Sequence, residues 1–168
     1  DIGIRLNPNT DAKTLSQIST GKKENKFGVN NKTFLELVNY CRNSKNINLR
    51  CLSVHIGSQI LDFKPYVQML KTIQNIIIKT NYKFEFVDLG GGMGIAYDNK
   101  NKKLNYKKYN IAIKKFLKVI KTKIIFEPGR SIVGDIGTLI SKVIYMKESA
   151  KKNIIIQDAA MNDLMRTD

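Results

Sequence analysis

Hydrophobic residues along the chain alternate between short continuous runs and longer stripes with the spacing of one helix face. Four short runs, each closed within two residues by Gly, Pro or Asn, predict β-strands at residues 2–6, 51–56, 84–89 and 124–126. Apolar residues three and four positions apart predict amphipathic helices over 31–43, 63–77 and 109–120. The repeated order of strand, helix and strand favours a parallel sheet with helical crossovers, in a sheet or a barrel.

Two of the predicted helices carry start signals. Thr33 and Glu36 have the spacing of a capping box near the start of the first helix. Pro65 stands in the first turn of the second helix, where the missing N–H costs no hydrogen bond. These signals predict that the helices begin close to residues 31 and 63.

The pattern changes near residue 135. Beyond it, the apolar runs at 138–145 and 154–156 predict strands with no helix between them. We therefore expect a domain boundary near Ser131–Asp135. The expected division is a βα domain over 1–133 and a mainly β module over 134–168.

Three consecutive glycines, Gly90, Gly91 and Gly92, end the third predicted strand. Glycine backbone can take positive φ and gather N–H groups around an anion, as a phosphate requires, although a tight turn that binds nothing is the alternative. The Rossmann and Walker spacings are both absent. His55, Gly90 and Glu127 follow successive strands at intervals of 35 and 37 residues. In a parallel sheet such positions share one edge, so we expect them to form one site.

The polar residues at these strand ends suit a phosphate-bearing ligand. Ser58 adds a hydroxyl, and Arg130 adds a permanent positive charge that suits a phosphate or a carboxylate. Glu127 can accept a proton or pair with a cationic ring nitrogen, and His55 can donate, accept or stack. Alone, each has a structural explanation, such as a satisfied histidine or a Glu–Arg ion pair. Their place on successive strand ends favours a ligand site.

Composition narrows the classes of partner. The formal net charge is +15, which would suit nucleic acid or an anionic surface. However, only five of the 29 basic residues are arginines, and the lysines are scattered along polar helix faces. This distribution favours solvated lysine faces, as an AT-rich coding sequence would give, over nucleic-acid binding. No apolar run approaches the roughly 18 residues of a membrane span, so no membrane partner is expected.

Cysteine and histidine usage predicts no metal site. Cys41 and Cys51 have no metal-ligand spacing, and the sequence holds one histidine. Two small buried thiols are typical of a reducing compartment such as the cytoplasm.

Three segments closely resemble the pyridoxal-phosphate motifs of the fold type III decarboxylases: VHIGSQ at 54–59, GGGMGI at 90–95 and EPGR at 127–130. Two more, 19–28 and 161–166, resemble the group of that family that acts on meso-diaminopimelate rather than ornithine or arginine. The five motifs occur in the family's order over nearly the whole chain. The resemblance implies an α/β fold, the C-terminal half of an alanine-racemase-type TIM (β/α)8 barrel followed by the start of a mainly β domain.

The resemblance also implies a role for each site residue. His55 would stack on the pyridine ring of pyridoxal 5'-phosphate. Glu127 would keep the ring nitrogen protonated, which makes the ring a better electron sink. The substrate would be bound by Arg130 and Arg166. The residues assigned to the phosphate and its surroundings are Ser58, Gly90, Gly91, Gly92, Pro128, Gly129 and Arg130.

The implied reaction is decarboxylation of meso-2,6-diaminopimelate to L-lysine and carbon dioxide, by a homodimeric enzyme with a small-molecule substrate. Two alternatives remain open. A related decarboxylase of another basic amino acid would carry the same cofactor motifs. A non-catalytic module, either a degenerate cofactor-binding remnant or a basic nucleic-acid binder, is the alternative from a different class.

Several features depart from the family pattern. The chain has no leading Met and is short of the about 250 residues of a complete barrel, so we expect a piece of a larger protein. The family's Schiff-base lysine lies on an early strand that is absent here, and Lys22, Lys23 and Lys26 belong to a different loop. The C-terminal Cys-Glu segment, contributed across a dimer interface, is also missing. Ala160 and Thr167 stand where the family usually has Gly and Pro.

Overall fold

A computed structural model describes residues 1–12, 20–21, 26–97, 103–150 and 152–164. The chain divides into two compact units, Asp1–Gly134 and Asp135–Asp168. This division falls inside the segment 131–135 where the sequence pattern changes.

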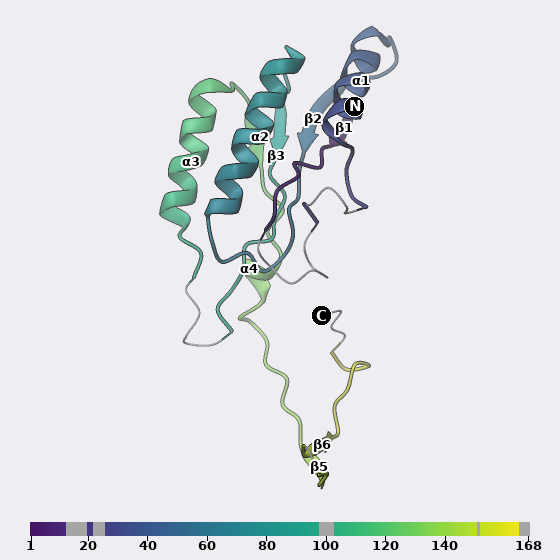
Figure 1. Cartoon of the computed structure of the whole chain (residues 1–168), viewed down its shortest axis with the longest axis vertical. Helices are drawn as coiled ribbons and strands as arrows, with labels where there is room; N and C mark the ends of the chain where they lie inside the picture. Colours follow the sequence, from purple (N-terminus) through teal and green to yellow (C-terminus); the bar gives the residue numbers. More distant parts are fainter. Residues whose placement is uncertain (13–19, 22–25, 98–102, 151, 165–168) are drawn as a thin grey trace. The chain divides into compact units, whose positions relative to one another are not determined.

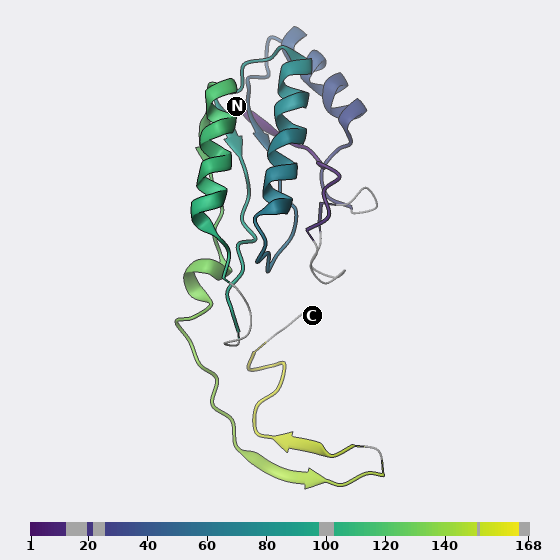
Figure 2. The ribbon, with the colours of Figure 1, turned by 60° about the vertical axis from the view of Figure 1, so that its left-hand side comes forward.

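The first unit is a four-stranded parallel sheet in which the strand order follows the chain order. Its strands are β1 (Ile2–Arg5), β2 (Leu49–Ser53), β3 (Phe86–Asp88) and β4 (Lys123–Ile125). The crossover helices are α1 (Asn31–Asn43), α2 (Lys64–Thr80) and α3 (Tyr106–Val119). All three helices lie on the same side of the sheet, with α2 and α3 side by side (Figures 1 and 2). The predicted parallel sheet with helical crossovers is confirmed.

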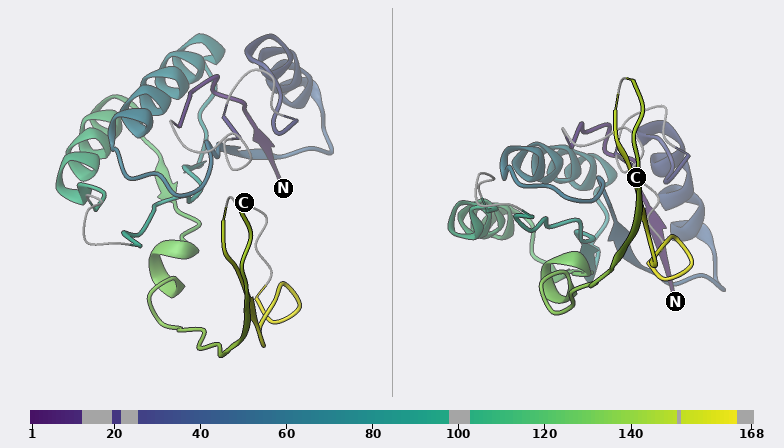
Figure 3. Two further views of the ribbon diagram at one scale, coloured as in Figure 1. Left: turned by 60° about the horizontal axis from the view of Figure 1, so that its bottom comes forward. Right: turned by 90° about the horizontal axis from the view of Figure 1, so that it is seen from below.

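The strand register separates a buried face from a polar face. Ile4, Leu52 and Val87 occupy one row across the sheet and are buried in the apolar core beneath the helices. The next row is Arg5, Ser53 and Asp88, and because side chains alternate along a strand it points to the opposite face. Figure 3 shows the helices together on one side of the sheet. The polar row stands at the carboxyl ends of the strands.

The helices begin and end with recognisable caps. The side-chain oxygen of Asn30 accepts the N–H of Thr33, so Asn30 is the N-cap of α1. The predicted capping box at Thr33 and Glu36 is therefore wrong, because a stronger cap residue stands directly before the helix. Pro65 lies in the first turn of α2 as predicted, and Asn81 ends that helix in the left-handed conformation. No helix among the described residues is long and apolar enough to cross a membrane.

The strand boundaries differ from those predicted. β2 begins at Leu49 and ends at Ser53, so residues 54–56 leave the regular ladder although Val54 still donates to the Asp88 carbonyl oxygen, 2.9 Å away. β3 (Phe86–Asp88) is shorter than the predicted 84–89, and all three of its residues pair with both β2 and β4. The short helix α4 (Arg130–Val133) was not predicted.

The second unit contains an antiparallel pair, β5 (Val143–Lys147) and β6 (Ile154–Gln157). Residues 138–142 are not in a strand, contrary to the predicted run from 138, because the four residues of β6 offer no ladder that far. The side chains of both strands are exposed.

The α2 helix offers a matched pair of substitutions that tests the core. Ile73 is fully buried, whereas Ile78 on the same helix is 56% exposed. We expect Ile73→Ala to lower the free energy of unfolding by about 2–5 kcal/mol, through lost burial and a residual cavity. Ile78→Ala should change it by less than about 0.5 kcal/mol. Urea unfolding of both variants measures the difference, and equal losses would contradict this assignment of the helix faces.

Candidate functional site

The structure brings together the strand ends that the sequence singled out. The N–H of Gly91 donates to Nδ1 of His55 over 3.3 Å, which joins the segments after β3 and β2. The N–H of Glu127 donates to the carbonyl oxygen of Gly90 over 2.9 Å, which joins the segments after β4 and β3. These bonds place His55, the glycine run and Glu127 at one edge of the sheet.

Close backbone approach explains the glycine run. A Cβ on Gly91 would overlap the carbonyl oxygen of Glu127, and one on Gly92 would overlap that of Gly57. Gly92 also has a φ of +84°, which side chains other than glycine rarely adopt. The turn therefore lies tightly between the loops that follow β2 and β4, and two of its N–H groups, those of Gly90 and Gly91, donate to Asp88 and His55 within the protein.

His55 is half-buried, and its hydrogen bond fixes its protonation state. Because Nδ1 accepts from Gly91, the proton of the neutral ring sits on Nε2. Burial lowers the pKa of His55 below its ordinary 6.5, and the positive charge of Arg5 lowers it further, while Asp88 acts in the opposite direction. The imidazole is therefore neutral at physiological pH.

The EPGR segment has open space beside Gly129 and an arginine, Arg130, that is hydrogen-bonded to Gln59. A Cβ on Gly129 would meet no atom within 4 Å, so space lies in front of this glycine. Nη1 of Arg130 donates to Oε1 of Gln59 over 3.4 Å, and the guanidinium lies 5.7 Å from the centre of the Tyr97 ring. Pro128 lines an apolar cavity of about 530 Å³ with residues of α3.

The remaining predicted residues are placed less completely. Ser58 is half-buried, directly before Gln59, in the loop that contains Gly57. Arg166, Lys22, Lys23 and Thr167 lie outside the described residues. Ala160 lies in a turn of the second unit, where it accepts from Asp163 and Leu164. Lys26 is exposed, and its Nζ lies 5.2 Å from the centre of the Phe27 ring.

Four further residues support the site although sequence reasoning gave them no role. The Tyr66 hydroxyl, buried in α2, donates to the Gly91 carbonyl oxygen over 3.1 Å. Oδ1 of Asp88 accepts the N–H of Gly90 over 2.8 Å and so shapes the start of the turn. Arg5 adds positive charge near His55, and Gln59 holds Arg130. Arg5 and Asp88 could have been found as charged residues at strand ends, whereas Tyr66 belongs to an ordinary apolar helix stripe.

The residues present fit a ligand that carries a phosphate and a cationic ring. A hydroxyl, a guanidinium and open space at Gly129 are suited to an anion, and the Glu127 carboxylate is suited to a protonated ring nitrogen. The neutral His55 adds no charge next to such a ring. Among the described residues, no group of three His, Cys, Asp or Glu could hold a metal ion.

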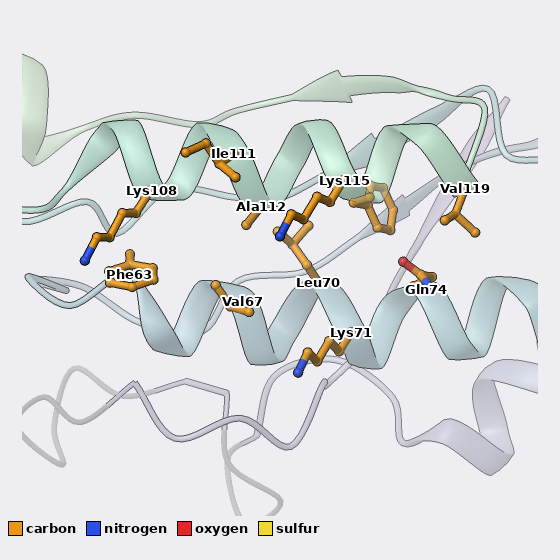
Figure 4. A pocket seen from close by; sticks show the side chains of 11 residues that line it. Phe63, Val67, Leu70, Lys71, Gln74, Lys108, Ile111, Ala112, Lys115 and Val119 are labelled. Atoms are coloured by element: carbon orange, nitrogen blue, oxygen red, sulfur yellow. The ribbon is translucent and has the colours of Figure 1, made fainter.

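A second hollow lies away from these strand ends. It has a volume of about 620 Å³ and runs between α2 and α3. Figure 4 shows Lys71 of α2 and Lys108 and Lys115 of α3 along it, together with apolar side chains that include Phe63 and Val67. None of the predicted site residues lines this groove, so it is separate from the candidate site.

Comparison with known proteins identifies the family. Residues 1–134 match the family described as pyridoxal-dependent decarboxylase, pyridoxal binding domain, and the chain belongs to this family. It is 42% identical to a diaminopimelate decarboxylase of Helicobacter pylori, over 98% of this chain and 41% of that protein. It is 39% identical to a diaminopimelate decarboxylase of Neisseria meningitidis serogroup B, over 98% of this chain and 40% of that protein.

A solved structure extends the similarity to the fold. The crystal structure of the Helicobacter pylori diaminopimelate decarboxylase complexed with L-lysine matches with a TM-score of 0.86 and 41% identity, covering 96% of this chain and 41% of that one. The fold class predicted from the sequence is thereby confirmed, and the first unit is part of an alanine-racemase-type barrel. The chain spans about two fifths of the length of the curated relatives it matches.

The lowered pKa of His55 predicts a pH-dependent stability. In the unfolded chain His55 is protonated as the pH falls below about 6.5, whereas in the folded chain it stays neutral until the pH reaches its lower folded-state pKa. The free energy of unfolding should therefore fall as the pH decreases from 6.5 toward the folded-state pKa. NMR titration of the imidazole should give a pKa below 6.5. In His55→Asn, where the side-chain oxygen still accepts from Gly91, the loss of stability between pH 7.5 and 5.5 should be smaller. An imidazole pKa at or above 6.5 would contradict the assignment.

Proposed function

We propose that this chain is the cofactor-binding part of a decarboxylase that converts meso-2,6-diaminopimelate into L-lysine and carbon dioxide. The observation that carries the proposal is the hydrogen-bonded junction of His55, the glycine run and Glu127, in a chain that belongs to a pyridoxal-binding family. The substrate is proposed because relatives about 40% identical are named diaminopimelate decarboxylase.

We assign the residues of the site to the parts of pyridoxal 5'-phosphate. Ser58, the glycine run and Gly129 would hold the phosphate, with Pro128 shaping the segment beside it. Glu127 would hold a proton at the ring nitrogen, and His55 would lie against the ring. Arg130 and Arg166 would bind carboxylate groups of the substrate.

When bound, the cofactor supplies an electron sink for the electron pair that remains as carbon dioxide leaves. The protein's own contribution is largely electrostatic. The Glu127 carboxylate keeps the ring nitrogen protonated, and the neutral His55 places no competing positive charge beside it. Arg130 and Arg5 supply the positive potential that an anionic ligand needs at this edge of the sheet.

The complete protein would supply the parts that this chain does not carry. We propose that it is a cytoplasmic homodimer, that a lysine from another segment would help to hold the cofactor, and that neither nucleic acid nor a membrane is its partner. The second candidate is a decarboxylase of another basic amino acid, since all the residues above except Arg166 are assigned at least in part to the cofactor, which such an enzyme would share. A degenerate cofactor-binding remnant is the third.

Two glycine substitutions separate cofactor binding from folding. Gly91→Ala should destabilise the protein strongly, because the new methyl group overlaps the Glu127 carbonyl oxygen. Gly129→Ala should leave the urea midpoint unchanged, because its methyl group enters open space, yet weaken binding of pyridoxal phosphate about tenfold or more by occupying the phosphate's place. Cofactor binding is measured by absorbance titration. Unchanged affinity in Gly129→Ala would remove Gly129 from the phosphate site.

The substrate assignment is tested in the complete protein that contains this chain. Loaded with pyridoxal phosphate, it should release carbon dioxide from meso-diaminopimelate with a kcat/KM at least about a hundredfold above those for L-ornithine and L-arginine, because a site with groups that bind the second carboxylate leaves them unpaired with either analogue. Equal rates on all three would favour the second candidate. Cofactor binding without release of carbon dioxide from any of them would favour the remnant.

A further inference from the structure

Gln59 joins three segments of the candidate site through one side-chain amide. Its Nε2 donates to the carbonyl oxygen of Ile95 over 2.7 Å, and its Oε1 accepts the N–H of Ile95 over 3.3 Å. The same Oε1 accepts from Nη1 of Arg130 over 3.4 Å. One half-buried amide thus links the loop after β2, the segment after the glycine run and the arginine of the EPGR segment.

The backbone at Gln59 is held in an unfavourable conformation. Its φ of +59° lies in the left-handed region, which residues other than glycine rarely adopt. A Cβ on Gly94 would lie 3.0 Å from Oε1 of Gln59, so the absence of a side chain there admits the amide. Next to it, the Ile60 N–H donates to the Gly92 carbonyl oxygen over 2.9 Å and fixes the two loops against each other. Such strain persists only where the surroundings determine the conformation.

Arg130 donates a hydrogen bond to the neutral amide of Gln59 rather than to a carboxylate. Within the described part of the chain, the Gln59 amide is the hydrogen-bond acceptor of Arg130, and no carboxylate pairs with the guanidinium. A guanidinium has five N–H groups, so a hydrogen bond from one of them to Gln59 leaves other N–H groups that can bind a carboxylate or a phosphate in pairs. Because an amide carries no net charge, the positive charge of Arg130 stays available to an anion.

We propose that Gln59 is a positioning residue for Arg130. By accepting from Nη1 it holds the guanidinium in the orientation that binds a carboxylate of the substrate, and its pairing with Ile95 makes that acceptor rigid. The inference rests on the proposed function, since the anion is assigned to the substrate there, and it adds a residue to which neither the sequence motifs nor the comparisons give a role.

The test uses pimelate, which has the two terminal carboxylates of diaminopimelate and no amine with which to react. Binding to the complete protein loaded with cofactor is measured by calorimetry. Gln59→Gly relieves the backbone but also removes the partner of the Ile95 N–H and carbonyl oxygen. Because these two effects on stability oppose each other, the urea midpoint should change little while the Kd for pimelate rises about tenfold. The KM for meso-diaminopimelate should rise by a similar factor, with kcat changed less than about twofold.

Two comparisons separate positioning from a structural role. In an Arg130→Lys background, Gln59→Gly should raise the Kd for pimelate by less than about twofold. If Gln59 acts only by orienting the Arg130 guanidinium, its loss has little effect once that guanidinium has been removed. Asn81→Gly is the matched control, since Asn81 also has positive φ, 47°, but caps α2 and contacts none of the site residues. It should leave the Kd for pimelate unchanged.

The possible outcomes distinguish failure of the Gln59 positioning role from failure of the proposed function. The same increase in Kd in both backgrounds, or no increase with Gln59→Gly alone, overturns the role of Gln59 while leaving the proposed function intact. If the unaltered complete protein releases no carbon dioxide from meso-diaminopimelate and does not bind pimelate, the proposed function fails and the positioning role fails with it.

Discussion

The arrangement of the site depends on how closely the backbone after β3 approaches its two neighbours. Gly91 lies against the Glu127 carbonyl oxygen and Gly92 against that of Gly57, so a side chain at either position would push the strand ends apart. Parallel pairing alone brings these ends to one edge, but it does not determine their distance. The missing side chains allow the turn to donate a hydrogen bond to His55 and to accept one from the N–H of Glu127. The candidate site residues that follow three strands are thus held together by one short turn.

Charges of both signs surround this turn. Arg130 is held by the neutral amide of Gln59. Burial lowers the pKa of His55 most, Arg5 at the end of β1 lowers it further, and Asp88 opposes them. The lysines that dominate the net charge lie elsewhere, as along the groove between α2 and α3. Because the carboxylates of Asp88 and Glu127 stand at the same strand ends as these two arginines, the local charges suit a ligand with both an anionic and a cationic group, which the overall charge does not indicate.

The sequence predicted the elements and the positions of the main site residues, because both follow from local patterns. The stripe from Phe63 to Ile77 predicted α2, and the even spacing of strand ends predicted which residues meet. Strand lengths were predicted less well, since β3 begins at Phe86 rather than at residue 84, although it ends close to the predicted position before the glycine run. Tyr66 and Gln59 could not be assigned, because the contacts of Tyr66 with Gly91 and of Gln59 with Arg130 span 25 and 71 positions in sequence.

Tyr66 links the packing of the hydrophobic core directly to the geometry of the candidate site. The ring is fully buried in α2 and stacks on Tyr109 of α3, with ring centres 4.4 Å apart, while its hydroxyl donates to the Gly91 carbonyl oxygen. Burial raises the pKa of Tyr66 far above its ordinary value, so the hydroxyl keeps its proton and remains a donor. A shift of either helix would pull on the carbonyl of the glycine whose N–H binds His55. The packing of α2 against α3 therefore sets the geometry of the turn, and apolar substitutions in that interface are expected to act on ligand binding without touching the ligand.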